Sequence, residues 1–427
     1  MSPVETDADV EHEIDRFSRE HAAGWIAYRR ERHCSPEPSG EEHETSHSVC
    51  ERLKSLGIDA HIPERGVGVV ADLLLGTADE LTPAIAIRAD IDALRMPDRK
   101  SVSYASIKEG LAHSCGHDVH TTIVLAVAEL LTHLKQSMSD HLPSARFRLL
   151  FQAAEESCDG ARWMVEDGFL KNVQSILGVH VEPNLLAGQI GVRYGVFTAQ
   201  VDELFIDICG RGGHTARPHS TTDPLHAAAM LVCQLYQMVP RSIDVRDSAV
   251  LTFGELHGGM ASNVIPDEMH LAGTLRTTSA ESRTELIDRI RSICRQFEAV
   301  TGNEIRVDFR HPLGSVVNSA RETSAFQKAA TSIVGRENVI ILDRPSMGGE
   351  DFAVYMDHCS GSQIRLGCAA SLPWPHLHSP LFDIDESAIA LGARVMTRTA
   401  LSLAGMPQLL LTSPAAHSSG KDEDGSA

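Results

Sequence analysis

Short apolar runs alternate with helical stretches along most of this 427-residue chain, and this alternation constrains the fold more than any other feature. Residues 84–90 (AIAIRAD) and 145–152 (ARFRLLFQ) have the largely apolar composition of strands that are buried on both faces. Residues 119–136, which lie between them, are expected to form a helix. Strands that alternate with helices favour a mostly parallel sheet with helices on both faces, so the expected fold class is α/β. The other expected strands of this sheet are 66–75, 175–181 and 363–368, and its other expected helices are 159–167, 320–335, 350–358 and 385–404.

The pattern changes near Gly195. The segments that follow are expected to form, in order, a strand, a helix, two strands, a helix and a strand, which is a self-contained α+β unit of the ferredoxin-like kind. They are residues 201–210, 223–239, 248–258, 268–277, 281–301 and 304–310. The predicted organisation is a main α/β domain in two parts, 14–194 and 311–412, with a smaller domain at 195–310 inserted between them. Residues 1–13 and the tail 413–427 are polar or low in complexity and are expected to be disordered.

Composition excludes some classes of partner. The chain has 38 Lys and Arg residues and 58 Asp and Glu residues, so its formal net charge is −20. This charge argues against nucleic acid or an anionic membrane as partner.

The nine cysteines are scattered and odd in number, which is typical of a reduced, intracellular protein without a disulfide framework. The acidic N-terminal segment lacks the apolar stretch of a signal peptide, and no run approaches the roughly eighteen apolar residues of a membrane span. We therefore expect a soluble cytoplasmic protein.

Residues 113–120, HSCGHDVH, concentrate groups that bind metals or move protons. A thiol and an imidazole two residues apart, at a turn that opens into a helix, can reach one metal ion together. The alternative for Cys115 is a buried apolar thiol, which is the usual fate of a free cysteine. Because Gly116 and His117 stand beside it, metal ligation is the favoured interpretation.

Glu155 and Glu156 lie just past an expected strand. Two neighbouring carboxylates can divide their roles, one as a metal ligand and the other as the acceptor of a proton from water whose pKa the metal lowers from about 15.7 toward about 7. The alternative is that the two glutamates lie at a helix N-terminus, where negative side chains interact favourably with the helix dipole, and have no catalytic role. Because Asp90, Asp92 and His180 follow or end neighbouring strands, the functional interpretation is favoured. For His180 itself, ligation and burial in the core are equally good interpretations.

The inserted unit carries further candidates. Its glycine-rich loop 210–214 ends in His214, which is either an electrophile or oxyanion donor or an exposed imidazole in a tight turn. Asn263 and Arg276 belong to the same unit, and a guanidinium suits a substrate carboxylate.

Near the C-terminus, a histidine in the loop 375–380 could complete the metal shell. Spacing alone does not choose between His376 and His378.

Together these motifs resemble the metallopeptidase family M20, and specifically its amidohydrolase branch, which includes hippurate hydrolases, N-acyl-amino-acid hydrolases and plant auxin-conjugate hydrolases. They keep the family's order over roughly residues 25–404. Two departures are Ser114, where alanine is usual, and Arg95, where proline is usual. The matching motifs are 88–94 (RADIDAL), 113–120 (HSCGHDVH), 151–156 (FQAAEE), 178–180 (GVH), 210–214 (GRGGH), 263–267 (NVIPD), 273–276 (GTLR), 349–352 (GEDF) and 377–380 (LHSP).

The resemblance implies a metal-dependent hydrolase that cleaves the amide bond of N-acyl amino acids. It implies two divalent ions per subunit, zinc or manganese, with cobalt or nickel also compatible, and it places Asp90 and Asp92 behind the ligands. The implied ligands are Cys115, His117, Glu156, His180 and His378.

The resemblance also implies roles for the remaining candidates. Glu155 would be the general base, and His214, Asn263 and Arg276 would contact the scissile carbonyl or the substrate's carboxylate. The inserted domain would act as a lid and dimerisation unit, which implies a homodimer.

Three other functions stay open from the sequence. One is a metallo-exopeptidase of the same fold that acts on dipeptides. Another is a thiol hydrolase in which Cys115 is the nucleophile and His117 the base, although a separation of two residues is poor geometry for that pair. The third is a non-catalytic relative that only binds a ligand.

Overall fold

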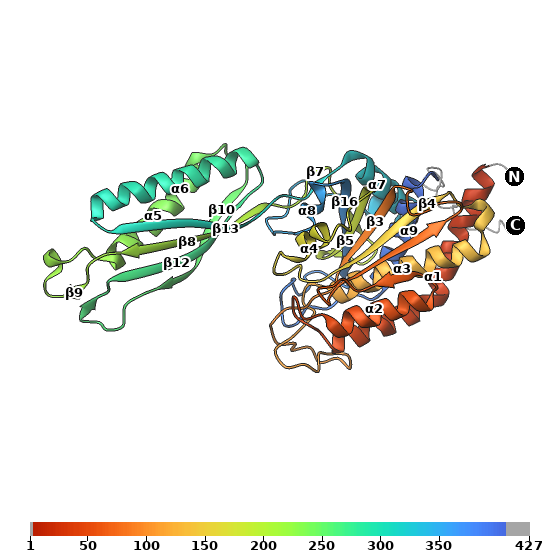
Figure 1. Ribbon diagram of the computed structural model, residues 1–427, viewed down its shortest axis with the longest axis horizontal. Helices are drawn as coiled ribbons and strands as arrows, with labels where there is room; N and C mark the ends of the chain where they lie inside the picture. The colour runs from red at the N-terminus through yellow and green to blue at the C-terminus, as the bar shows by residue number, and fades with distance from the viewer. Residues whose placement is uncertain (1–2, 407–427) are drawn as a thin grey trace, which may run out of the picture.

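The computed structural model describes residues 3–406, with side chains from Ala8 onward, and it contains two bodies joined by a pair of crossing segments (Figure 1). The larger body is built on a sheet of eight strands in the order β1-β2-β4-β3-β5-β16-β6-β15. Strands β4, β3, β5 and β16 run parallel and form its middle, while β1 and β2 on one side and β6 on the other pair in the antiparallel sense. The expected α/β class with a largely parallel sheet is confirmed. The strands are β1 (Asp59–His61), β2 (Val69–Leu75), β3 (Ala84–Asp90), β4 (Ala145–Gln152), β5 (Val173–Leu186), β6 (Ile190–Val192), β15 (Val339–Ile341) and β16 (Ser360–Ala369).

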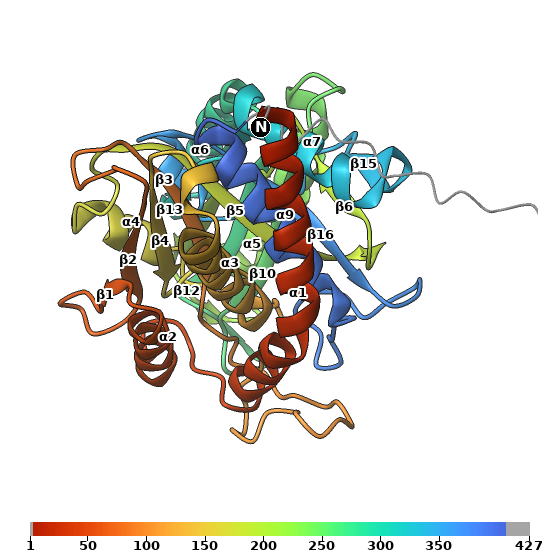
Figure 2. The ribbon, with the colours of Figure 1, turned by 90° about the vertical axis from the view of Figure 1, so that its right-hand side faces the viewer.

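Helices cover both faces of this sheet, and the side chains between the layers form two apolar clusters. Strand β3 is buried at every position, because helices pack on both sides of it. Figure 2 shows α1, α3 and α9 running together over one face. The helices on that face are α1 (Pro3–Cys34), α2 (His43–Ser55), α3 (His117–Ser137), α7 (Ala320–Val334) and α9 (Ser387–Leu403); α4 (Gly160–Glu166) and α8 (Ala353–Met356) lie on the other.

The N-terminal segment is ordered, so the prediction of disorder for residues 1–13 was wrong for the part that the structure describes. Helix α1 begins at Pro3, and Val10 and Ile14, one helical turn apart, are fully buried against the core. Asp15 fixes the helix further by accepting hydrogen bonds from Arg394 and Arg398 of α9. The tail 413–427 lies outside the described residues.

A second difference concerns the expected helix 350–358, of which only the four residues of α8 are helical. The backbone N–H of Phe352 donates to the Glu350 side chain, and Arg88 pairs with both Glu350 and Asp351. These side-chain bonds compete with helical hydrogen bonds at the start of the segment.

The smaller body has the expected order of a strand, a helix, two strands, a helix and a strand. Its four antiparallel strands lie in the order β10-β12-β8-β13, and α5 and α6 bury one face of the sheet around their own apolar cluster. Figure 1 shows this body projecting away from the central sheet, with the short pair β9 and β11 at its far end. The predicted domain boundaries stay a prediction. The elements are β8 (Gln200–Cys209), β9 (Gly213–His214), α5 (Pro224–Ser242), β10 (Ala249–His257), β11 (Val264–Ile265), β12 (Glu268–Thr277), α6 (Ala280–Thr301) and β13 (Glu304–Leu313), and the short pair β7 (Gly195–Val196) and β14 (Val317–Asn318) closes the connection.

No helix within residues 3–406 is both long enough and apolar enough to span a membrane.

Candidate metal centre

The carboxyl ends of the parallel strands bring the candidate ligands to one edge of the central sheet. Glu155 and Glu156 follow β4, and the octet 113–120 leads into α3 at the same edge. The expectation that His180 ends its own strand was wrong, because β5 continues to Leu186. Strand β3 pairs with β5 only as far as Gly178, so His180 lies just past the part of β5 that is bonded to β3, while it stays paired with β16 on its other side.

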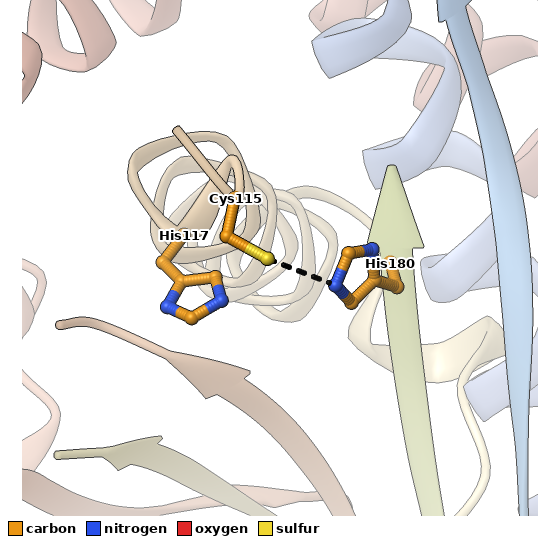
Figure 3. A group of neighbouring side chains, drawn as sticks. All are labelled: Cys115, His117 and His180. Atoms are coloured by element: carbon orange, nitrogen blue, oxygen red, sulfur yellow. Dashed lines mark hydrogen bonds between the residues drawn. The ribbon is translucent and has the colours of Figure 1, made fainter. Parts of the chain in front are cut away.

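A left-handed turn at Gly116 allows Cys115 and His117 to face one space. Gly116 has a φ of +86°, and a Cβ atom there would lie 2.5 Å from Cγ2 of Val181, so only glycine fits. Figure 3 shows the side chains of Cys115, His117 and His180 meeting in front of the helix, with the Sγ atom of Cys115 3.5 Å from Nε2 of His180. The turn explains how two ligands only two residues apart can serve one site.

His117 is oriented as a ligand by the carboxylate behind it. Its Nδ1 lies 2.9 Å from Oδ1 of Asp92, which leaves Nε2 facing the site. That Nε2 is buried and has no hydrogen-bond partner within the described part of the chain. It lies 3.8 Å from Glu155 and 3.9 Å from Glu156. A carboxylate behind an imidazole is the usual support of a metal-binding histidine, and the orphaned nitrogen marks where a cation fits.

His180 is oriented in the same way by a backbone carbonyl. Its Nδ1 lies 2.8 Å from the carbonyl oxygen of Val181, and its Nε2 points toward Cys115. Burial, followed by the positive charge of Arg365, holds the pKa of His180 well below its usual range. The ring is therefore neutral, which is the form that binds a metal.

Glu156 and His378 complete the cluster from two further segments. Nε2 of His378 lies 3.5 Å from Oε1 of Glu156, and Cys115, Glu156 and His378 offer ligand atoms within 4.8 Å of one another. Oε1 of Glu156 is buried and has no hydrogen-bond partner among the described residues. The structure thus brings His378 into this cluster, whereas His376 belongs to no such group among residues 3–406.

Glu155 lies beside the cluster in a strongly acidic environment. Its carboxyl is buried, and burial together with the charges of Glu350, Glu156 and Asp351 raises its pKa well above the usual range. A carboxyl with a raised pKa is suited to accept a proton and later to release it.

The donor set fits divalent cations. The five predicted ligands form two triads of sulfur, nitrogen and oxygen donors that share Cys115. The two unpartnered buried atoms among them, Nε2 of His117 and Oε1 of Glu156, lie 3.9 Å apart. Burial, followed by the charge of Glu156, raises the pKa of the Cys115 thiol well above its usual range. A nucleophilic cysteine without a metal needs the opposite shift, so this environment counts against the thiol-hydrolase interpretation, whereas a bound cation would itself stabilise the thiolate.

His120, the last residue of the octet, plays a different role. Its Nε2 accepts a hydrogen bond from the Val181 backbone N–H, and its Nδ1 lies 2.6 Å from Asp90. Asp90 in turn accepts from the buried Arg88. Both ring nitrogens are occupied, so His120 supports the site from behind, as the sequence suggested for Asp90.

The sequence interpretation missed Glu42, which shapes the loop that carries the two glutamates. Oε1 of this fully buried residue accepts a hydrogen bond from the Ala154 backbone N–H at 2.7 Å. Ala154 has a φ of +56° and directly precedes Glu155. Burial, followed by the charge of Asp92, raises the pKa of Glu42 to about 7. No local pattern identifies Glu42, because it contacts a backbone group 112 positions away.

The cluster opens into a cleft of about 780 Å³ between the two bodies. Arg276 of β12 lines this cleft from the smaller body, and its Nη1 donates to the carbonyl oxygen of Met347. His214 and Asn263 do not line it. They lie around β9 and β11 at the far end of the smaller body, where His214 is exposed (Figure 1). Within one chain, therefore, the structure brings Arg276 to the cleft and leaves His214 and Asn263 away from it.

Comparison with known proteins gives a consistent set of relatives. A family model described as peptidase family M20/M25/M40 matches residues 86–402. The N-acetyl-L-cysteine deacetylase of Bacillus subtilis (strain 168) is 36% identical over 365 residues, which cover 85% of this chain and 84% of that protein. The IAA-amino acid hydrolase ILR1-like 4 of Arabidopsis thaliana is 35% identical over 374 residues, which cover 86% of this chain and 83% of that protein.

A solved structure agrees with these relatives. The crystal structure of a Bacillus subtilis protein, described as a dinuclear metal binding peptidase from the M20 family, matches with a TM-score of 0.78 and 30% sequence identity. The match covers 90% of this chain and 99% of that one.

Proposed function

The chain belongs to peptidase family M20/M25/M40, and from that premise we propose a metal-dependent amidohydrolase that cleaves N-acyl amino acids into a carboxylic acid and a free amino acid. The observation that carries this proposal is the cluster of orphaned ligand atoms on His117 and Glu156 beside the buried carboxyl of Glu155. The relatives named as a deacetylase of N-acetyl-L-cysteine and a hydrolase of IAA-amino acids support an N-acyl amino acid as substrate.

We assign the metal site to two divalent cations per subunit. The overlapping triads and the similarity to a dinuclear structure support this number. The mixed sulfur, nitrogen and oxygen donors are compatible with zinc or manganese, and also with cobalt or nickel. The ligands in this assignment are Cys115, His117, Glu156, His180 and His378.

The proton transfers are assigned to Glu155. Two bound divalent cations would supply Lewis acidity, which lowers the pKa of water from about 15.7 toward about 7 and polarises an amide carbonyl. Glu155, 3.8 Å from the free nitrogen of His117, then takes the proton of the attacking water and delivers it to the leaving amine. Its acidic, buried surroundings favour the protonated form that this second step requires.

Substrate binding is assigned to the smaller body. Arg276 lines the cleft and suits the carboxylate of the amino acid. His214 and Asn263 suit the scissile carbonyl, but they lie outside the cleft of their own chain. We therefore propose a homodimer through the inserted domain, in which His214 of one subunit reaches the cleft of the other, with the smaller body serving as lid and dimerisation unit.

The cytoplasm is the proposed location. All nine cysteines are free, although several are buried where a disulfide would be protected. A reducing compartment would also keep the Cys115 thiol available to a metal.

The decisive test is turnover of a panel of N-acyl amino acids and dipeptides after metal-free protein is reloaded with single metals. We expect release of the free amino acid from N-acyl amino acids, with dipeptides cleaved much more slowly. Preferred cleavage of dipeptides would instead establish an exopeptidase. Absence of turnover on the whole panel by metal-loaded protein, with ligand binding unchanged in Glu155→Ala, would support a non-catalytic relative.

A further inference from the structure

Arg365 is a buried cation in the wall of the cleft. It lies on β16, directly opposite His180 of the neighbouring strand, and both residues line the cleft. Only 9% of its surface is exposed. Its guanidinium lies over the ring of Phe197, 5.0 Å from the centroid.

This arginine differs from every other buried arginine among the described residues. Each of the others forms an ion pair with a carboxylate; they are Arg29, Arg32, Arg88, Arg146, Arg148 and Arg398. Within residues 3–406 the guanidinium of Arg365 makes neither an ion pair nor a hydrogen bond to protein. The carboxylates that line the same cleft, including Glu155 and Glu156, form no ion pair with it.

A largely buried charge is normally paired with a carboxylate, and that of Arg365 is not. No nitrogen of Arg365 is both buried and without a partner, so its guanidinium is open to the cleft. The ring of Phe197 compensates only in part, because a cation–π contact is weaker than a buried ion pair. An anion that enters the cleft would supply the missing partner, and the planar guanidinium suits a carboxylate. Arg276 already offers one cationic group on the opposite, smaller body, so Arg365 provides a second on the main body.

We propose that Arg365 binds a second carboxylate of the substrate, so that the preferred substrates are N-acyl amino acids with an additional acidic group. This inference rests on the proposed amidohydrolase function. The additional carboxylate belongs either to a dicarboxylic acyl group, such as succinyl, or to an acidic amino acid, such as glutamate. Both sources present the same chemistry to the guanidinium.

Paired substrates that differ only in this charge test the proposal. One pair is N-succinyl-alanine and its neutral succinamoyl analogue, and the other is N-acetyl-glutamate and N-acetyl-glutamine. In the wild-type enzyme we expect kcat/KM to favour the charged member of one pair by about tenfold or more, the effect of one charge-assisted hydrogen bond. The pair that shows the preference identifies the source of the carboxylate.

Arg365→Met should reduce that ratio to about one, and Arg365→Lys should retain part of it. Arg321→Met, which removes a 60% exposed arginine of α7, is the matched control and should keep the wild-type ratio. Equal turnover of both members of both pairs by the wild type would overturn the proposal. An equal loss on charged and neutral substrates in Arg365→Met would also overturn it, because Arg365 would then bind a group common to all of them.

A measurement without turnover keeps this test separate from that of the proposed function. Thermal unfolding of metal-loaded protein is followed with and without succinate or glutarate. We expect one of these dianions to raise the midpoint of the wild type and not that of Arg365→Met. If Arg365 only packs on Phe197, the dianions will act equally on both proteins, which would refute the proposal even if no substrate is cleaved.

Discussion

The two bodies of this protein hold their candidate residues in opposite ways. At the edge of the central sheet, His117 and His180 are buried, and each is oriented by a partner on its Nδ1 side. In the smaller body, His214 is exposed, and its Nδ1 accepts only from the Ala216 backbone N–H of its own turn. In one chain the proposed metal half of the site is therefore already assembled, whereas the proposed carbonyl-binding half would need movement or a second subunit.

The difference follows from the architecture of the two sheets. Parallel strands end together, so their following loops meet at one edge and can be supported by buried groups such as Asp92 and Glu42. The smaller sheet is antiparallel with one open face, and its loop to β9 extends away from the main body. Organisation of a site before substrate arrives is thus expected mainly for the metal half.

The largest effect should come from metal removal. Exhaustive chelation should abolish activity, and adding back a divalent metal should restore it, because all five assigned ligands belong to the organised half. Cys115→Ser should lower the bound metal measured by elemental analysis, whereas Cys233→Ser, at an exposed position, should not. Activity that survives chelation and disappears when Cys115 is alkylated would instead establish a thiol hydrolase.

Glu155→Gln should lower kcat by about 10²- to 10⁴-fold, because the amide cannot accept the proton. Its metal content should stay at the wild-type level, since Glu155 is assigned no ligand role. Glu156→Gln is the matched comparison, one position away, and should lose metal as well as activity. If kcat of Glu155→Gln stays within a few-fold of the wild-type value, Glu155 is not the general base.

His214→Ala should lower kcat by about 10²- to 10³-fold, the usual loss for one donor to a developing oxyanion. The subunit exchange is the sharper measurement. Mixing His214→Ala with Glu155→Gln and allowing dimers to exchange should restore about a quarter of wild-type activity, because half of the dimers then contain one complete site. If mixed dimers form but activity does not recover, His214 must act in the cleft of its own chain. The proposed difference between the two bodies would then be wrong.

Of these variants, Glu42→Gln should have the smallest effect on activity. Its effect on the free energy of unfolding should depend on pH. The pKa of Glu42 in the folded protein, about 7, is above its value of 4.5 in the unfolded chain. Between these values the folded protein holds a proton that the unfolded chain has lost, so the stabilising contribution is present below pH 4.5 and lost as pH rises through 7. At pH 8 the glutamine variant should therefore gain up to about 3 kcal/mol of unfolding free energy relative to wild type, with little difference at pH 5.

Urea unfolding at several pH values between 5 and 8 measures this difference. Glu44→Gln, two positions away in the first turn of α2 with a side chain that is 70% exposed, should show no such trend. A stability difference for Glu42→Gln that does not change with pH would show that its carboxyl is not protonated in the organised loop.

Much of the fold was predictable because the apolar runs in the sequence coincide with the strands that are buried in the structure. The strands β3 and β4 begin and end where the apolar runs do, and the inserted unit has its expected order of elements. The prediction failed at the start of α1, where a charged sequence hides buried residues such as Val10 and Ile14. It failed again at 350–358, where Arg88, remote in the sequence, pairs with side chains at the start of the segment.

The sequence by itself determined the types of ligand and the turn that joins two of them, because Gly116 between Cys115 and His117 is a local requirement of the backbone. It also indicated the chemistry, through the adjacent pair Glu155 and Glu156 after a strand. Only the tertiary structure decided which groups stand behind the proposed ligands and which arginine of the cleft has no carboxylate partner within residues 3–406. Glu42 and Arg365 have no local signature, since the support given by one and the missing partner of the other depend on contacts between segments far apart in the chain.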